Sequence, residues 1–203
     1  MPFVSIEGID GSGKSVQVKR LVERLRAEGR SVVQTKEPDG GRLGKEVRAI
    51  LTHGDRQLER VEELLLINAA RYDHVQSVIR PALAGGDWVV SDRYFDSTYA
   101  LQVFGAAEDL RPLLDAVLQA VVGDARPHVT IILDLPPDRA AARRTIRKDG
   151  LDDPAEDMRD FFQIADGFRS AAANDPDRCH LVNADRAEEE VAADIWSRIS
   201  PLL

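Results

Sequence analysis

The 203-residue chain has only one cysteine, Cys179, so neither an internal disulfide nor a zinc site built on several cysteines can form. Its four histidines show no metal-ligand spacing. No apolar run approaches the roughly 20 residues of a membrane-spanning helix. The N-terminus has no basic start, and Glu7 and Asp10 interrupt its apolar residues, which is unlike a signal peptide. We therefore expect a cytoplasmic protein with no membrane partner.

The chain also lacks an excess of positive charge, with 27 Lys and Arg against 35 Asp and Glu and a net charge of −8. A broad nucleic-acid surface needs clustered cations, so we expect no nucleic-acid partner. A small anionic ligand remains possible because it needs only a local positive pocket. The length and the hydrophobic share of 43% suit a single domain over residues 1–203 with a buried core.

Short apolar runs alternate with longer segments of helical period. The runs predict strands at 3–6, 31–35, 88–91, 129–133 and 180–182. The other segments predict helices at 18–29, 58–83 (one helix or two), 107–122, from about 138, and on both sides of the last strand. The nearly all-apolar run 129–133 is typical of a strand buried on both faces of a parallel sheet. This alternation predicts a three-layer α/β fold with a mainly parallel five-stranded sheet.

Residues 8–15, Gly-Ile-Asp-Gly-Ser-Gly-Lys-Ser, match the phosphate-binding pattern G-x-x-x-x-G-K-[ST], with a predicted strand before them and a helix after them. The glycines let successive backbone N–H groups turn toward phosphate oxygens, and the helix adds its positive end. Lys14 is expected to reach the terminal phosphates and the Ser15 hydroxyl to bind Mg²⁺. The pattern predicts a nucleoside triphosphate held by this P-loop, with Gly8, Asp10, Gly11, Ser12, Gly13, Lys14 and Ser15 as binding residues.

Two further polar segments, 37–41 and 91–94, follow the second and third predicted strands. Ligands of open parallel sheets bind beyond the carboxyl ends of the strands, where the P-loop also lies. Arg48, Arg71 and Arg93 fall on or beside these segments. Because a guanidinium makes paired, charge-assisted hydrogen bonds, these arginines indicate a second phosphate beside the first.

With these motifs the chain resembles the thymidylate (dTMP) kinase family of P-loop nucleoside monophosphate kinases. The matching residues run in family order over most of the chain: Glu7 to Ser15; Glu37-Pro38 with Gly40, Leu43-Gly44 and Val47-Arg48; Ala69-Ala70-Arg71 with His74; Asp92-Arg93-Tyr94 with Asp96-Ser97-Thr98 and Gln102; Arg126-Pro127; and Phe161-Phe162. The block from Asp92 to Gln102 is more specific than the P-loop.

The resemblance implies transfer of a phosphoryl group from ATP to dTMP with Mg²⁺, a homodimer, and a short lid at about 148–157. On the donor side it implies that Lys14 and the loop amides hold the ATP phosphates, and that Ser15 binds the metal. Asp92 would lie near the metal's water shell and Arg144 beside the adenine.

On the acceptor side the resemblance implies that Arg48 and Arg93 hold the phosphate of dTMP and that Asp10 faces the 3′-hydroxyl. The expected substrate-binding residues are Asp10, Glu37, Arg48, Ile67, Arg71, Arg93, Thr98 and Gln102, with Arg71 and Gln102 hydrogen-bonded to the pyrimidine. An amide suits this task because it offers a donor and an acceptor to a base edge. The expected catalytic residues are Lys14, Arg93, Asp10 and Asp92.

Four positions depart from the family pattern. Ile67 replaces a phenylalanine that stacks on thymine, Leu101 a tyrosine linked to ribose exclusion, and Asp39 a glycine near the acceptor phosphate. In the lid, Asp152-Asp153 replaces an Asp-Arg pair, so a lid arginine's role would pass to Arg143, Arg147 or Lys148.

These departures leave two alternatives to a dTMP kinase. One is a kinase for another pyrimidine monophosphate: dUMP, a modified deoxynucleotide or a ribonucleotide. The other is a catalytically poor, ATP-binding regulatory protein. We further expect packing roles for Tyr94 and Cys179 and a salt bridge or helix cap from Asp134.

Overall fold

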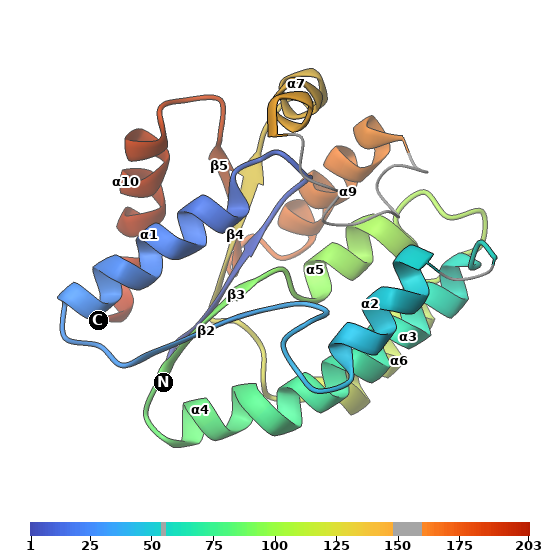
Figure 1. Cartoon of the computed structure of the whole chain (residues 1–203), viewed down its shortest axis with the longest axis horizontal. Coiled ribbons are helices and arrows are strands. Elements are labelled where there is room, and N and C mark those ends of the chain that lie inside the picture. The colour runs from blue at the N-terminus through green and yellow to red at the C-terminus, as the bar shows by residue number, and fades with distance from the viewer. Residues whose placement is uncertain (54–55, 148–159) are drawn as a thin grey trace.

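The computed structural model describes residues 1–53, 56–147 and 160–203, and within these the side chains other than those of 53 and 144–147. Five parallel strands form one sheet in the order β2-β3-β1-β4-β5 (Figure 1). They are β1 (Phe3–Glu7), β2 (Val32–Lys36), β3 (Trp88–Asp92), β4 (Val129–Asp134) and β5 (Cys179–Asn183). All five were predicted, and the parallel α/β fold is confirmed.

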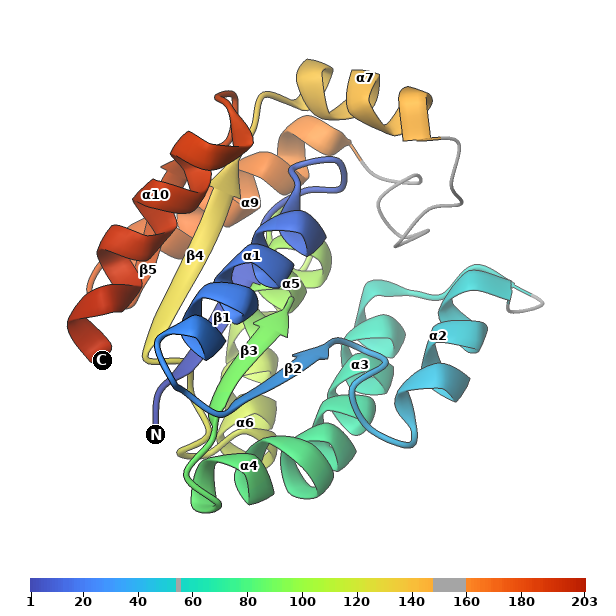
Figure 2. The same ribbon diagram turned by 60° about the vertical axis from the view of Figure 1, so that its left-hand side comes forward.

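Helices cover both faces of the sheet. On one face α1 (Lys14–Ala27) packs beside α10 (Glu188–Ile199), and on the other lies α9 (Phe161–Asn174), with β4 between α9 and α10 (Figure 2). The remaining helical segments are α2 (Gly44–His53), α3 (Arg60–His74), η1 (Val75–Ile79), α4 (Arg80–Ala84), α5 (Phe95–Thr98), η2 (Tyr99–Val103), α6 (Arg111–Val121), α7 (Pro137–Arg147) and η3 (Ser200–Leu202). None of the helices among the residues that the structure describes meets the length and apolarity needed to cross a bilayer.

The strands β1 and β4 lie at the centre of the hydrophobic core. Every residue of β1 is buried, and so are the first five residues of β4. A strand covered on both faces has no solvent side, which explains why 129–133 is apolar almost throughout. Since β1 is flanked by β3 and β4, the loop that follows it lies at the middle of the sheet's carboxyl edge.

Two helical regions differ from the prediction. The expected helix at 58–83 is α3, η1 and α4 in series, with a π-helical stretch at 75–79 before Pro81, which has no backbone N–H to continue an α-helical ladder. The segment 95–103 was not assigned, yet it forms α5 and the π-helical η2. All nine of its residues are buried, so no side of the segment faces solvent and its sequence shows no amphipathic period.

Candidate active site

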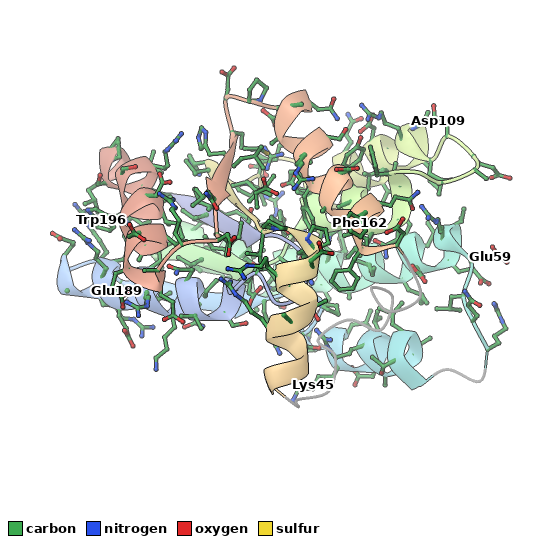
Figure 3. The ribbon with its side chains drawn as sticks, turned by 90° about the horizontal axis from the view of Figure 1, so that it is seen from above. Lys45, Glu59, Asp109, Phe162, Glu189 and Trp196 are labelled. Atoms are coloured by element: carbon green, nitrogen blue, oxygen red, sulfur yellow. The ribbon has the colours of Figure 1, made fainter. Side chains whose placement is uncertain are left out.

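The P-loop connects the end of β1 at Glu7 to the start of α1 at Lys14. Gly8, Gly11 and Gly13 have φ values of 137°, 85° and 94°, which L side chains rarely adopt. A Cβ on Gly11 would also lie 2.6 Å from the Ala140 carbonyl oxygen of α7. The loop therefore needs glycine for its curl and for the close approach of α7, which lies in front of this edge when the molecule is seen from above (Figure 3).

Three charged side chains meet beside this loop. Lys14 Nζ donates to the Ile9 carbonyl oxygen at 3.0 Å and lies 3.6 Å from Asp10 Oδ1. The same Asp10 oxygen is 3.2 Å from Arg93 Nη2. All three residues are buried, so their charges interact in a region with little water to screen them. The structure thus brings together residues 10, 14 and 93, as the sequence predicted.

The backbone of Arg93 is unusual, with φ of 70°, the one positive φ of a non-glycine residue in the described parts of the chain. Its N–H donates to the Ile6 carbonyl at 3.0 Å, and its own carbonyl accepts from Ser91 Oγ at 2.7 Å. Its Nη1 donates to Ser97 Oγ at 3.1 Å. These contacts hold a conformation that costs free energy, which is common where a side chain must point into a site.

Ser15 and Asp92, the two predicted metal-binding residues, are in contact. Ser15 Oγ donates to Asp92 Oδ2 at 2.9 Å. Both groups offer oxygen atoms, which Mg²⁺ prefers, and a magnesium ion at a nucleotide usually takes only one or two protein ligands beside phosphate oxygens and water. The described residues contain no cluster of three or more His, Cys, Asp or Glu that would form a separate metal cage.

A small cavity of about 60 Å³ opens where the P-loop, β2 and β3 end. It is lined by Lys14, Ser15, Lys36, Glu37, Arg48, Asp92 and Arg93. Arg48 and Arg93 therefore face the same space as the P-loop lysine, although they come from α2 and from the end of β3. Lys36 is not among the residues predicted from the sequence, although it is the last residue of a strand at the predicted edge.

Arg48 forms an ion pair with Asp39, one of the residues that depart from the family pattern. Its Nε lies 2.8 and 2.9 Å from the two carboxylate oxygens of Asp39. Lys36 Nζ is 3.0 Å from Asp39 Oδ2. One carboxylate thus contacts two of the four cations that line the small cavity.

The predicted base-binding residues form a second group on α3 and α5–η2. Arg71 is 1% exposed; its Nε donates to Glu37 Oε2 at 2.8 Å, Nη1 to Asn68 Oδ1 at 2.7 Å and Nη2 to Thr98 Oγ1 at 2.9 Å. Burial opposes ionisation of Glu37, but the Arg71 charge and a hydrogen bond from His74 bring its pKa below the usual value. Glu37 also lines the small cavity, so it connects the predicted base-binding residues with the cations of that cavity.

Gln102 is fully buried at the end of this second group. Its Nε2 donates to Glu63 Oε2 at 3.0 Å, whereas its Oε1 has no hydrogen-bond partner in the described structure. Ile67 lies one turn from both Glu63 and Arg71 on α3 and is partly buried. Glu63 and Asn68 were missed, since no sequence pattern shows which polar residues of α3 face the site.

A larger cavity of about 530 Å³ lies on the other side of the P-loop. Its lining comes from the loop and α1 (Gly11, Ser12, Gly13, Ser15, Val16, Gln17), from α7 (Arg143), and from the segment around α10 (Ala184, Arg186, Glu188, Val191). Arg143 Nη2 donates to the Ala184 carbonyl at 3.2 Å. The predicted Arg144 is in α7, but its side chain lies outside the described residues, as do Asp152-Asp153 and the expected lid at 148–157.

Three residues have the structural roles that the sequence predicted. Tyr94 is fully buried, packs edge-on against Phe3, and donates its hydroxyl to the Ala125 carbonyl at 3.0 Å. Cys179 is buried, which raises the pKa of its thiol. Asp134 accepts from Arg169 Nε at 3.0 Å, so its predicted salt bridge is confirmed.

Glu7, the last residue of β1, is linked to Arg93 through Ser97, whose hydroxyl contacts both side chains. Its Oε1 accepts from the Tyr94 N–H at 2.7 Å and its Oε2 from Ser97 Oγ at 2.5 Å. Complete burial, together with the negative charge of Asp96, raises the pKa of Glu7 from 4.5 to about 8. The carboxyl group is therefore largely protonated at neutral pH in the folded protein.

Glu7→Gln should change how stability depends on pH. Below pH 4.5 the Glu7 carboxyl is neutral in both the folded and the unfolded protein. Between pH 4.5 and about 8 it ionises only in the unfolded chain. The free energy of unfolding of the wild type therefore falls as pH rises through this range. Glutamine does not titrate. The variant's free energy of unfolding, relative to wild type, should therefore rise from pH 5 to pH 8, by at most about 1.4 kcal/mol per pH unit. Urea denaturation at several pH values measures this, with exposed Glu23→Gln as control; parallel curves for Glu7→Gln and wild type would contradict it.

The comparisons with known proteins identify one family. The family model described as Thymidylate kinase matches residues 6–195. A thymidylate kinase of Jannaschia sp. (strain CCS1) is 44% identical, covering 99% of this chain and 97% of the relative, and one of Dinoroseobacter shibae is 42% identical over 98% and 96%. The crystal structure of thymidylate kinase from Ehrlichia chaffeensis, 31% identical, aligns over 98% of both chains with a TM-score of 0.79. The chain therefore belongs to the thymidylate kinase family.

Proposed function

We propose that this chain carries out the family's reaction, ATP-dependent phosphorylation of dTMP to dTDP, across the P-loop, with ATP in the larger cavity and the dTMP phosphate in the smaller one. The observation that carries the proposal is that Arg48 and Arg93 line the same cavity as Lys14 and Ser15. Phosphoryl transfer depends mainly on in-line placement of donor and acceptor and on offsetting the charge of the moving group. A cavity flanked by the P-loop and two guanidinium groups meets both needs.

On the donor side, the loop amides and Lys14 hold the ATP phosphates, and Ser15 and Asp92 hold Mg²⁺ directly or through water. The oxygen donors of these two side chains fit this ion. Bound Mg²⁺ supplies positive charge to the donor phosphates. Arg143 also lines this cavity and donates to the Ala184 carbonyl, and so joins Arg144 as a candidate for contact with the adenine.

On the acceptor side, Arg93 and Arg48 bind the dTMP phosphate and Asp10 faces the sugar. Glu37 orients Arg71, which with Gln102 and Thr98 faces the pyrimidine edge, while Ile67 packs on the ring. The buried Gln102 Oε1 supports this role, because an acceptor that lacks a partner is costly unless a ligand donates to it. The N3–H of thymine is such a donor.

The acceptor preference tests this function against the other pyrimidine monophosphates. With ATP and Mg²⁺, dTMP should have the highest kcat/KM in a panel with dUMP, UMP and dCMP, and EDTA should abolish transfer. A higher value for another acceptor would favour the alternative that Ile67 and Leu101 suggest. Tight ATP binding without transfer to any pyrimidine monophosphate would favour a regulatory protein.

We also propose that the chain forms a homodimer. The exposed face of α3 carries Leu65 and Tyr72, two turns apart on the same side and 48% and 52% exposed. Large apolar side chains gathered on one helix face favour a self-complementary contact. Light scattering should give twice the 22.4 kDa chain mass; the mass of a single chain at working concentration would remove this proposal.

A further inference from the structure

Asp39 binds the cations of the small cavity from inside the protein. It lies just after β2, and its side chain is 12% exposed. Its carboxylate oxygens contact Arg48 Nε at 2.8 and 2.9 Å and Lys36 Nζ at 3.0 Å. Both cations line the cavity proposed for the acceptor phosphate.

A carboxylate and a phosphate monoester present similar oxygen atoms to such donors. Each can accept charge-assisted hydrogen bonds from a guanidinium or an ammonium group. Burial opposes ionisation of Asp39, but hydrogen bonds from Arg48 and Lys36 bring its pKa below the usual value. Asp39 is therefore negatively charged at neutral pH, and a second anion on the same donors would be repelled.

We propose that Asp39 is an internal competitor of the acceptor phosphate, whose oxygens must replace its carboxylate at Arg48 and Lys36, so that Asp39 weakens binding of the nucleoside monophosphate. The proposal rests on the proposed function, in which Arg48 binds that phosphate. It assigns Asp39 a specificity role, because a ligand without a phosphate does not need these cations.

Arg93 differs from Arg48 in this respect. The contact of Arg93 Nη2 with Asp10 Oδ1 is longer, at 3.2 Å, and the second cation at that carboxylate, Lys14, lies 3.6 Å away. At Arg48, the guanidinium Nε meets both oxygens of Asp39 at under 3 Å. The binding free energy that a phosphate gains at Arg48 is thus reduced, because the phosphate must break the ion pair between Arg48 and Asp39.

Calorimetric binding of dTMP and thymidine to the full chain tests the proposal. Thymidine shares the base and sugar of dTMP but has no phosphate. In Asp39→Asn and Asp39→Ala, the dissociation constant for dTMP should fall by about fivefold to tenfold, since a partly exposed ion pair no longer competes. The constant for thymidine should stay within about twofold of wild type.

A matched control removes a carboxylate paired with an arginine elsewhere. Asp124 is 84% exposed and lies 2.6 Å from Arg80 Nη2, in the segment that precedes β4 and hence at the opposite end of the strands. Asp124→Asn should leave both dissociation constants unchanged.

Two results in the Asp39 variants would overturn the proposal. Weaker dTMP binding would show that Asp39 positions Arg48 for the phosphate. An equal increase in affinity for dTMP and thymidine would show a general change in the pocket and not the loss of a competitor for the phosphate. If wild type binds dTMP no more tightly than thymidine, the proposed phosphate site itself fails, and the inference fails with it.

Discussion

Lys14→Ala should lower kcat for transfer from ATP to dTMP by about 10³-fold, or about 4 kcal/mol of transition-state stabilisation. Lys14 is 6% exposed, belongs to the P-loop and lines the small cavity. During transfer, negative charge develops on the phosphate oxygens that leave with ADP, so loss of this ammonium should reduce kcat more than it raises KM for ATP. Steady-state kinetics with dTMP separates the two constants.

The fold should tolerate this change. Lys14 Nζ contacts the Ile9 carbonyl and Asp10, and Asp10 keeps its contact with Arg93 in the variant. Lys19→Ala is a matched control on the same helix, because that side chain is 75% exposed and lies 3.9 Å from Glu23. The control should retain full activity, and both variants should melt within a few degrees of wild type. A Lys14→Ala protein with near-normal kcat would show that the P-loop does not hold the donor phosphates.

The parts of this site that the sequence predicts follow from local patterns and one rule about sheets. Residues 8–15 form a contiguous motif between a strand and a helix, so its loop could be placed without coordinates. Arg48 and Arg93 are 45 positions apart, yet both follow strands of a parallel sheet. Because the carboxyl ends of such strands share one edge, both arginines could be expected near the P-loop.

Other contacts depend on tertiary geometry that no local pattern contains. Gln102 meets Glu63 because the π-helical η2 packs on α3, and η2 is buried throughout and therefore lacks a helical period. The family resemblance places Asp39 near the acceptor phosphate, but its contacts with Lys36 and Arg48 depend on how the loop after β2 packs against α2. Sequence patterns identify residues that face a common edge, whereas the partner of each polar group depends on packing.

The ion pair between Asp96 and Arg178 is another such contact. We expect it to contribute strongly to the free energy of unfolding of the protein. Arg178 Nη1 and Nη2 donate to the two Asp96 oxygens at 2.7 and 2.8 Å, with side chains 12% and 6% exposed. Nη1 also donates to Thr130 Oγ1 at 2.6 Å. The two residues are 82 positions apart, with Asp96 in α5 and Arg178 directly before β5, which lies beside the strand of Thr130, β4.

Arg178→Met should therefore destabilise the protein by about 3–5 kcal/mol, because it leaves the buried Asp96 carboxylate without its counterion. In a domain of this size, each kcal/mol lowers Tm by about 2–4 °C, so a fall of roughly 10 °C is expected. Urea denaturation and thermal melting measure the change. Arg139→Met is the matched control: that arginine is 67% exposed and pairs with Asp185 at 3.1 Å, so its loss should cost about 1 kcal/mol or less.

A second substitution separates loss of charge balance from loss of packing. In Arg178→Met with Asp96→Asn, no unpaired carboxylate remains, so the double variant should recover part of the stability lost in Arg178→Met. A loss below about 1 kcal/mol in Arg178→Met, or no recovery in the double variant, would contradict a dominant ion pair. Asp96 is followed by Ser97, whose hydroxyl contacts both Glu7 and Arg93. Loosening this pair should thus disturb the positioning of Arg93 and lower kcat even at temperatures where the variant remains folded.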